Sequence, residues 1–382
     1  MSAARRSFAK ATATLAASLA LLAVRAPRPL AAQTVEEARD ILHQLVEAYG
    51  VSGHEAPVRD AVRRLLPAWA QAEVDTAGNL LIRAGSGAPL TIFVAHLDEI
   101  GFTVTTVRDD GQLTLRAIGG FMPSLFEAEP ALVHTAQGIV PAVFTLRDSL
   151  GTSPRRTPVA PGGGPRPELL VRVDPGTGSR AGTEALGIHP GDVVTMPKRY
   201  VSLAGTRATA RSFDDRVGCT ALLLALRHLD PLRLPHAELF VFSVREEIGL
   251  EGARAVARAT AGEAPPRVYA LDTFVSADAP LEVKTFADAP LGRGAVARAV
   301  DNSSVTPPAV LDSLVRLAQL RRIPLQVGAT NGGNDGSMFT RFGTVDVGIG
   351  WPLRYAHSPA EVIDLRDVVA MAQLTLAVAE RW

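Results

Sequence analysis

The pattern of apolar and polar residues divides the chain into three stretches, the first of which combines helices with strands. Residues 34–50 repeat apolar side chains at helical spacing behind a capping box, and a second helix is expected from Pro57 to about Trp69. The segments NLLIRAG (79–85) and LTIFVAHLD (90–98) follow as strands. The continuous apolar run of the second segment is typical of a strand covered on both faces.

The second stretch, from about Phe102 to Leu203, consists of short alternating segments separated by turns that contain Gly and Pro. This pattern predicts a small all-β module. Residues 148–167, DSLGTSPRRTPVAPGGGPRP, are rich in Pro, Gly and Ser, and we expect them to form a mobile loop within the module.

The third stretch, after Thr209, alternates between helices and strands. The helices are expected at 214–229, 249–259, 308–321 and 365–380, and the strands at 237–244, 267–272 and 344–349. Such alternation is typical of a sheet with helices on both faces. We therefore predict one α/β domain, made of residues 33–101 and 206–382 and interrupted by a β insert at 102–205.

The first residues have a different character. In residues 1–32, Arg5 and Arg6 precede an apolar run from Ala11 to Val24, and small residues follow at Ala31 and Ala32. This order predicts a signal peptide of the twin-arginine type and an exported, periplasmic or extracellular protein. The alternative is an anchored N-terminal helix. No later apolar run is long enough for a membrane span.

Composition narrows the class of protein. Among 382 residues, 47% are hydrophobic and 20% charged, as in a globular protein. The full chain has no formal net charge, and without residues 1–32 it would carry 34 basic and 39 acidic residues, a net charge of −5. No basic patch indicates nucleic-acid binding. The single cysteine, Cys219, excludes an internal disulfide, so a large core or bound metal must stabilise the fold.

Histidine and acidic residues lie at the ends of the expected strands. The set comprises His96, Asp98, Asp214, Asp215, Glu246, Glu247, Asp272 and His357. Taken singly, each has an ordinary structural explanation, such as helix capping or a surface loop. Because site residues of open α/β sheets gather at the carboxyl ends of strands, we expect the set to lie together. Its mixed nitrogen and oxygen ligands predict a two-metal hydrolytic site that suits zinc, cobalt or manganese better than calcium.

The adjacent pair Glu246 and Glu247 is costly beside an apolar strand unless a cation offsets its charge repulsion. Neighbouring residues of an extended segment point in different directions. One carboxylate can therefore bind a cation while the other stays free to move protons. The spacing leaves open which glutamate has which role.

Five ordered motifs resemble the tetrahedral-aminopeptidase and glutamyl-aminopeptidase family of co-catalytic metallopeptidases, some of which were once labelled endoglucanase or cellulase M. The motifs are AHLDEIGF (95–102), FDDRVGC (213–219), REEIGLEGA (245–253), ALD (270–272) and RYAHSPAEV (354–362). The resemblance extends from about Thr34 to Trp382. It departs in FMPSLFEAE (121–129), where relatives usually carry Trp-Asp and Leu-Pro-Gly, and in NGGNDGSMF (331–339), where they have a Gly-Thr-Asp type of segment.

The resemblance implies two divalent metal ions per subunit, zinc first, with cobalt or manganese as alternatives. His96 and Asp272 would bind one ion, Glu247 and His357 the other, and Asp214 would bridge them. The family fold implies an α/β/α catalytic domain of the phosphorylase/hydrolase-like type with a mixed sheet. Its insert would be a PDZ-like β-barrel that acts as a lid and in assembly.

The same resemblance assigns the catalytic roles to Glu246 and Asp98. Glu246 would be the general base that takes a proton from a water held between the metals and passes it to the leaving amine. Asp98 would support the site from behind His96. The implied protein is an exported aminopeptidase that acts on peptides and forms homo-oligomers, up to dodecamers. The alternatives are a metal-dependent amidohydrolase or deacylase on the same scaffold, and a non-catalytic exported metal-binding protein.

Overall fold

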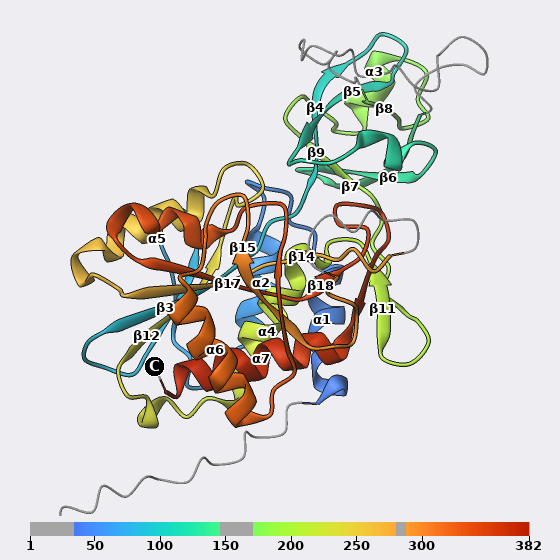
Figure 1. The fold of residues 1–382 in the computed structure, drawn as a ribbon. Coiled ribbons are helices and arrows are strands. Elements are labelled where there is room, and N and C mark those ends of the chain that lie inside the picture. Colours follow the sequence, from blue (N-terminus) through green and yellow to red (C-terminus); the bar gives the residue numbers. More distant parts are fainter. Residues whose placement is uncertain (1–33, 146–170, 280–287, 382) are drawn as a thin grey trace, which may run out of the picture.

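The computed structural model describes residues 34–145, 171–279 and 288–381. The expected signal peptide at 1–32 and the expected mobile loop at 148–167 lie outside these ranges. Figure 1 shows an α/β body from which a smaller, all-β body stands away. None of the helices in the described ranges combines the length and the apolar character that a bilayer crossing needs.

The α/β body is built on an eight-stranded sheet. In spatial order its strands are β1 (Ala72–Val74), β2 (Leu80–Ala84), β12 (Ala237–Ser243), β3 (Leu90–His96), β13 (Arg267–Leu271), β17 (Val345–Gly350), β15 (Ala295–Val300) and β16 (Leu325–Ala329). The four central strands run parallel to one another, whereas β2 and β15 are antiparallel to their central neighbours. The predicted α/β fold with a mixed sheet is confirmed.

Apolar layers cover both faces of this sheet. Strand β3 is buried at every position, and its alternate side chains enter two different clusters. Phe93 and Ala95 pack with the helices on one face, and Ile92 and Val94 pack with the helix on the other. The first face carries α1 (Val35–Glu47), α2 (Ala56–Leu65), α4 (Phe213–His228), α6 (Pro308–Arg321) and α7 (Leu365–Ala379), and the second carries α5 (Glu251–Thr260).

Most predicted element ends agree with the structure to within two residues, and the differences have local causes. The second helix stops at Leu65 rather than Trp69, since Pro67 turns residue 66 into an extended conformation. Helix α5 starts at Glu251 rather than Gly249, because Gly249 and Leu250 both have positive φ. Strands β15 and β16, which extend the sheet beyond β17, were not predicted.

The all-β body is a closed barrel with its own core. Its strands, in spatial order, are β4 (Gly101–Val107), β5 (Leu113–Ile118), β8 (Val171–Asp174), β7 (Gly138–Phe144), β6 (Pro130–Thr135) and β9 (Val193–Thr195). Phe102 sits at its centre and meets Phe126 edge-on, with 5.5 Å between the ring centroids. The short helices η1 (Pro123–Phe126) and α3 (Arg180–Ala185) complete the body.

Two small sheets lie beside the segments around the site, and the first of them begins just after the chain leaves the barrel. One contains β10 (Val201–Ser202), β11 (Arg207–Ala210) and β19 (Glu361–Asp364), and the other pairs β14 (Phe274–Val275) with β18 (Pro352–Leu353). Strand β11 leads directly into α4, and β19 into α7. The segments that carry Asp214 and His357 are therefore tied together by a β-ladder.

Candidate metal and catalytic site

Three neighbouring parallel strands bring the candidate residues to one edge of the sheet. Strand β3 ends at His96, β13 ends immediately before Asp272, and β12 ends three residues before Glu246. Because β3 lies between β12 and β13, all three ends meet at the place where α/β sheets usually carry their sites. Asp214 reaches this edge from the first turn of α4.

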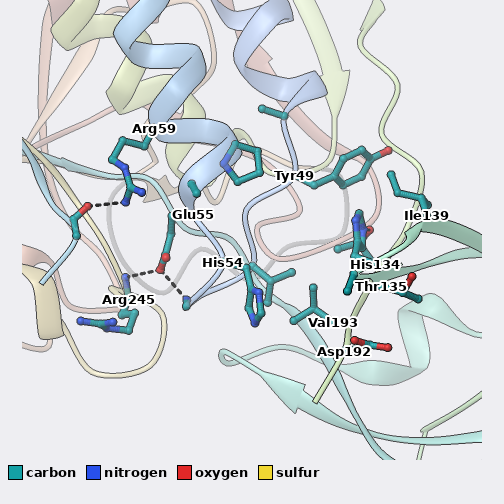
Figure 2. A pocket seen from close by; sticks show the side chains of 18 of the residues that line it. Tyr49, His54, Glu55, Arg59, His134, Thr135, Ile139, Asp192, Val193 and Arg245 are labelled. Atoms are coloured by element: carbon teal, nitrogen blue, oxygen red, sulfur yellow. Dashed lines mark hydrogen bonds between the residues drawn. The ribbon is translucent and has the colours of Figure 1, made fainter. Parts of the chain in front are cut away.

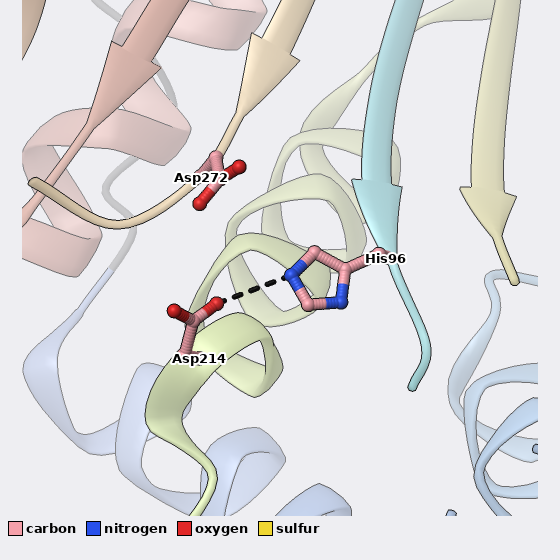
Figure 3. A group of neighbouring side chains, drawn as sticks. All are labelled: His96, Asp214 and Asp272. Carbon is pink, nitrogen blue, oxygen red and sulfur yellow. Dashed lines mark hydrogen bonds and ion pairs between the residues drawn. The ribbon is translucent and has the colours of Figure 1, made fainter. Parts of the chain in front are cut away.

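The first group of possible metal ligands consists of His96, Asp214 and Asp272, all of them buried. Figure 3 shows their side chains converging from the ends of β3 and β13 and from the start of α4. One ligand atom from each residue lies within 4.8 Å of the others. Nε2 of His96 lies 3.1 Å from Oδ1 of Asp214.

The second group shares Asp214 and adds Glu247 and His357, again with ligand atoms within 4.8 Å of one another. Nε2 of His357 lies 3.4 Å from Oδ2 of Asp214 and 3.2 Å from Oε1 of Glu247. The two oxygens of Asp214 thus face different histidines. This is the position that a ligand shared by two ions would need.

The two groups are rich in buried carboxylates, which nearby positive charge stabilises in their ionised form. Burial opposes ionisation, yet His357 and His96 hold the pKa of Asp214 below its ordinary value. Burial raises the pKa of Asp272 to about 6, and the charge of Asp214 adds to that rise. Conversely, burial would lower the pKa of His96, but Asp214 and Asp98 raise it well above its ordinary value. Divalent ions would meet the same demand for positive charge, and the nitrogen and oxygen donors fit them.

Glu246 lies beside both groups and belongs to neither. Its Oε2 is 3.9 Å from Nε2 of His96, and its side chain borders the cavity at the site. Burial raises the pKa of Glu246 well above its ordinary value, and Asp272 and Glu247 add to the rise. A carboxylate that readily holds a proton and stays clear of the ligand set is suited to proton transfer.

Asp98 connects the two strand ends behind the ligands. Its Oδ1 and Oδ2 accept hydrogen bonds from the backbone N–H groups of Glu246, at 2.9 Å, and of Glu247, at 3.2 Å. Ser52 Oγ donates to Oδ2 at 2.5 Å, and Nδ1 of His96 lies 3.5 Å from Oδ1. The buried carboxylate therefore orients the glutamate pair as well as the His96 ring.

Two further buried carboxylates hold the ligand backbones in place. Asp215 was expected to lie with the candidate residues without a specific role, and Glu361 was not among them. Asp215 accepts from the backbone N–H of His96 at 2.8 Å. Glu361 accepts from Phe213 N–H at 2.6 Å and from His357 N–H at 2.8 Å, and burial raises its pKa to about 8. The sequence signal for Glu361 is its position four residues after His357 in RYAHSPAEV (354–362).

A third residue without a predicted role is Arg298 on β15. Its guanidinium lies 3.1 Å from Asp272 and 3.3 Å from Asp301, and it also donates to the carbonyl oxygens of Thr273 and Gly333. Arg298 thereby balances part of the charge of Asp272 from behind. Nothing in the local sequence around Arg298 indicates this contact.

Two cavities of similar size lie near the site. The one of about 760 Å³ contains Asp214, Glu246, Glu247, Asp272 and His357 in its wall. The other, of about 790 Å³, lies between the barrel and α2 and contains neither group of possible metal ligands (Figure 2). In its wall Glu55 accepts from the backbone N–H groups of Gly53 and Arg245, which fixes the chain just before Glu246.

Known proteins share both the sequence and the fold. The profile of the M42 glutamyl aminopeptidase family matches residues 78–374. A glutamyl aminopeptidase of Lactococcus lactis is 28% identical over 86% of this chain and 92% of its own, and a lysyl aminopeptidase of Pyrococcus furiosus is 28% identical over 89% and 96%. The solved TET1 peptidase of Pyrococcus horikoshii is 31% identical, with a TM-score of 0.78, over 90% of this chain and 100% of that chain.

The prediction of export is wrong. The related peptidases carry no signal peptide of the predicted kind. The prediction depended on residues 1–32 alone, where two arginines precede a stretch rich in alanine and leucine and produce a basic and mildly apolar composition. Such a composition is necessary for an export signal but not specific to one.

Proposed function

Because the chain belongs to the M42 glutamyl aminopeptidase family, we propose that it removes N-terminal residues from peptides at a site with two divalent metal ions. The observation that carries the proposal is the placement of Asp214 between two histidines, each beside a further carboxylate. His96 and Asp272 would hold one ion, Glu247 and His357 the other, and Asp214 both. Zinc is the first candidate, with cobalt or manganese as alternatives.

Bound metal ions would polarise the scissile carbonyl group and make the attacking water more acidic. The residues of the chain transfer the proton and hold the reacting groups in position. Glu246, outside both ligand groups, accepts the proton of the water and delivers it to the leaving amine. Asp98 keeps Glu246 and Glu247 at their places through the two backbone N–H groups that it binds. Gly120 accepts a hydrogen bond from Nδ1 of His357 at 2.6 Å, which leaves Nε2 free to act as a ligand.

The decisive experiment is Glu246→Gln in the metal-loaded enzyme. We expect kcat/KM for an aminoacyl anilide to fall by about 10²–10⁴-fold, the usual contribution of a general base. The metal content, measured by elemental analysis, should stay unchanged, whereas His96→Ala should lower it. Glu263→Gln, which changes an exposed glutamate on the surface, is the matched control. Undiminished turnover by Glu246→Gln would refute the assignment.

We also propose that the chain self-associates and that its barrel, which we assign as PDZ-like, takes part. The Pyrococcus horikoshii relative can assemble into a tetrahedron or a large octahedral shell. Here the outward face of β7 exposes Ile139 and Val143, and Leu186 is exposed beside α3. Apolar side chains on the outside of a small barrel are typical of contact surfaces. Light scattering should give a mass that is a multiple of that of the 40.3 kDa chain.

A further inference from the structure

We infer that the site selects peptides whose first residue has an uncharged, apolar side chain, such as leucine, methionine or phenylalanine. The inference rests on the proposed aminopeptidase function and concerns the wall of the same 760 Å³ cavity. Relatives are named for glutamyl and lysyl substrates, so membership of the family leaves this preference open.

Apolar side chains line this cavity together with the metal-type residues. They come from three separate places: Phe121, Met122 and Leu125 follow β5, Leu250 precedes α5, and Val275 lies on β14. Met122 is 64% exposed, Leu125 40% and Val275 43%. Apolar side chains that stay in water around a highly charged site indicate a surface for an apolar ligand.

The segment that carries Phe121 and Met122 is held in position where it leaves β5. Phe121 packs edge-on against Phe102 in the barrel core, with ring centroids 5.1 Å apart. One residue earlier, the carbonyl oxygen of Gly120 accepts the hydrogen bond from His357. This part of the apolar wall is therefore tied to His357 before a substrate arrives, which favours selection by shape and polarity.

No described residue of the wall offers a free charge to a substrate side chain. The acids Asp214, Glu246, Glu247 and Asp272 all belong to the proposed metal and proton-transfer groups. The cation Arg298 is only 3% exposed and is engaged by Asp272 and Asp301. A charged first side chain would lose water contacts against this wall without gaining a counter-charge from its described residues, whereas an apolar one would gain by burial.

The test is a panel of aminoacyl p-nitroanilides with the metal-loaded enzyme. We expect kcat/KM for the leucyl and methionyl substrates to exceed that for the glutamyl and lysyl substrates by at least about tenfold, the scale on which apolar pockets discriminate. A glutamyl or lysyl substrate cleaved best would overturn this inference and leave the proposed function intact. Failure to cleave any member of the panel would instead overturn the proposed function, and this inference with it.

Variants of the exposed wall make the test specific. Met122→Lys should reduce the leucyl-to-glutamyl ratio of kcat/KM by about tenfold, and Met122→Glu should reduce the leucyl-to-lysyl ratio similarly, because each supplies a counter-charge. Leu232→Lys, at a residue that is 94% exposed and outside the cavity wall, is the matched control and should change neither ratio. If the Met122 variants altered the mass in light scattering but neither ratio, the wall would be a subunit contact and the inference would be wrong.

Discussion

Glu246 and Glu247 are adjacent in the chain, yet their carboxylates lie near different histidines. The pair was expected on an extended segment, but it lies in a turn after β12, where Arg245 has a φ of 54°. The carboxylate of Glu247 faces His357, and that of Glu246 faces His96. Asp98 accepts hydrogen bonds from the backbone N–H groups of both, which stabilises the turn in this orientation.

Glu238 on β12 gives a prediction at the scale of a single residue. It is fully buried, and burial raises its pKa from 4.5 to about 10. Between these two values the folded chain keeps a proton that the unfolded chain has released, so stability falls as pH rises through this range. Glu238→Gln removes this dependence and should increase the free energy of unfolding at pH 8 by roughly 1–3 kcal/mol, through relief of an unfavourable buried acid.

Denaturant unfolding at pH 5 and pH 8 measures the effect. The gain from Glu238→Gln should be smaller at pH 5 than at pH 8, because fewer unfolded chains are ionised there. Glu73→Gln on the exposed edge strand β1 is the control and should show no such difference. An equal gain at both pH values would contradict the prediction.

At the scale of the elements, one buried carboxylate, that of Glu99, links the segment after β3 to the end of the barrel and to the start of α4. Glu99 lies 2.5 Å from Nζ of Lys198, at the exit of the barrel, and 3.5 Å and 3.6 Å from the guanidinium groups of Arg211 and Arg216 near α4. It also accepts from the backbone N–H of Gly50 at 2.9 Å, between α1 and α2. Burial would raise the pKa of Glu99, but the three cations hold it well below its ordinary value.

Glu99→Gln should therefore destabilise the fold by about 3–5 kcal/mol, because three buried cations lose their common partner. Since the pKa of Glu99 is depressed in the folded state, its contribution is complete above pH 4.5 and is lost only as pH falls below that value. Thermal or denaturant unfolding at neutral pH measures it. Glu263→Gln breaks an exposed pair with Arg83 and, as control, should cost less than about 1 kcal/mol. Equal losses in the two variants would contradict the prediction.

At the scale of the whole molecule, the barrel contributes to the site that the α/β body carries. The chain leaves β5 through Gly119, whose φ is 89°. A Cβ at Gly119 would lie 2.6 Å from Cγ2 of Ile100 and 3.3 Å from Oε2 of Glu247. The two bodies thus meet at a proposed metal ligand, so their relative placement matters for catalysis.

Gly119→Ala should lower kcat/KM by at least about tenfold, since displacements of about 1 Å in a catalytic group are costly. The metal content and the circular dichroism spectrum separate a displaced Glu247 from an unfolded barrel. Gly176→Ala is the matched control, because Gly176 also lies in the barrel body, has a φ of 83° and has open space around its Cβ position. If both variants lost activity equally, backbone strain rather than crowding of Glu247 would be the cause.

Local sequence signals predicted the regular elements well. Helix α6 was expected at 308–321 and is observed at Pro308–Arg321, where a proline begins it and a left-handed Arg322 ends it. The strands that end at or next to His96 and Asp272 were also predicted from the sequence. Periodicity, proline and caps act within a few residues of one another, so they remain visible in a sequence without its fold.

What the sequence alone determined is the α/β order, the β insert and the residue types that gather at the strand ends. Only the tertiary structure decided which groups support them. Phe213 and Glu361 are 148 residues apart, and Arg298 meets Asp272 across the sheet edge. Such contacts have no local signature, because the chain brings their partners together only when its sheet and barrel close. The placement of Asp214 between His96 and His357, on which the proposed chemistry depends, arises only when the chain closes in this way.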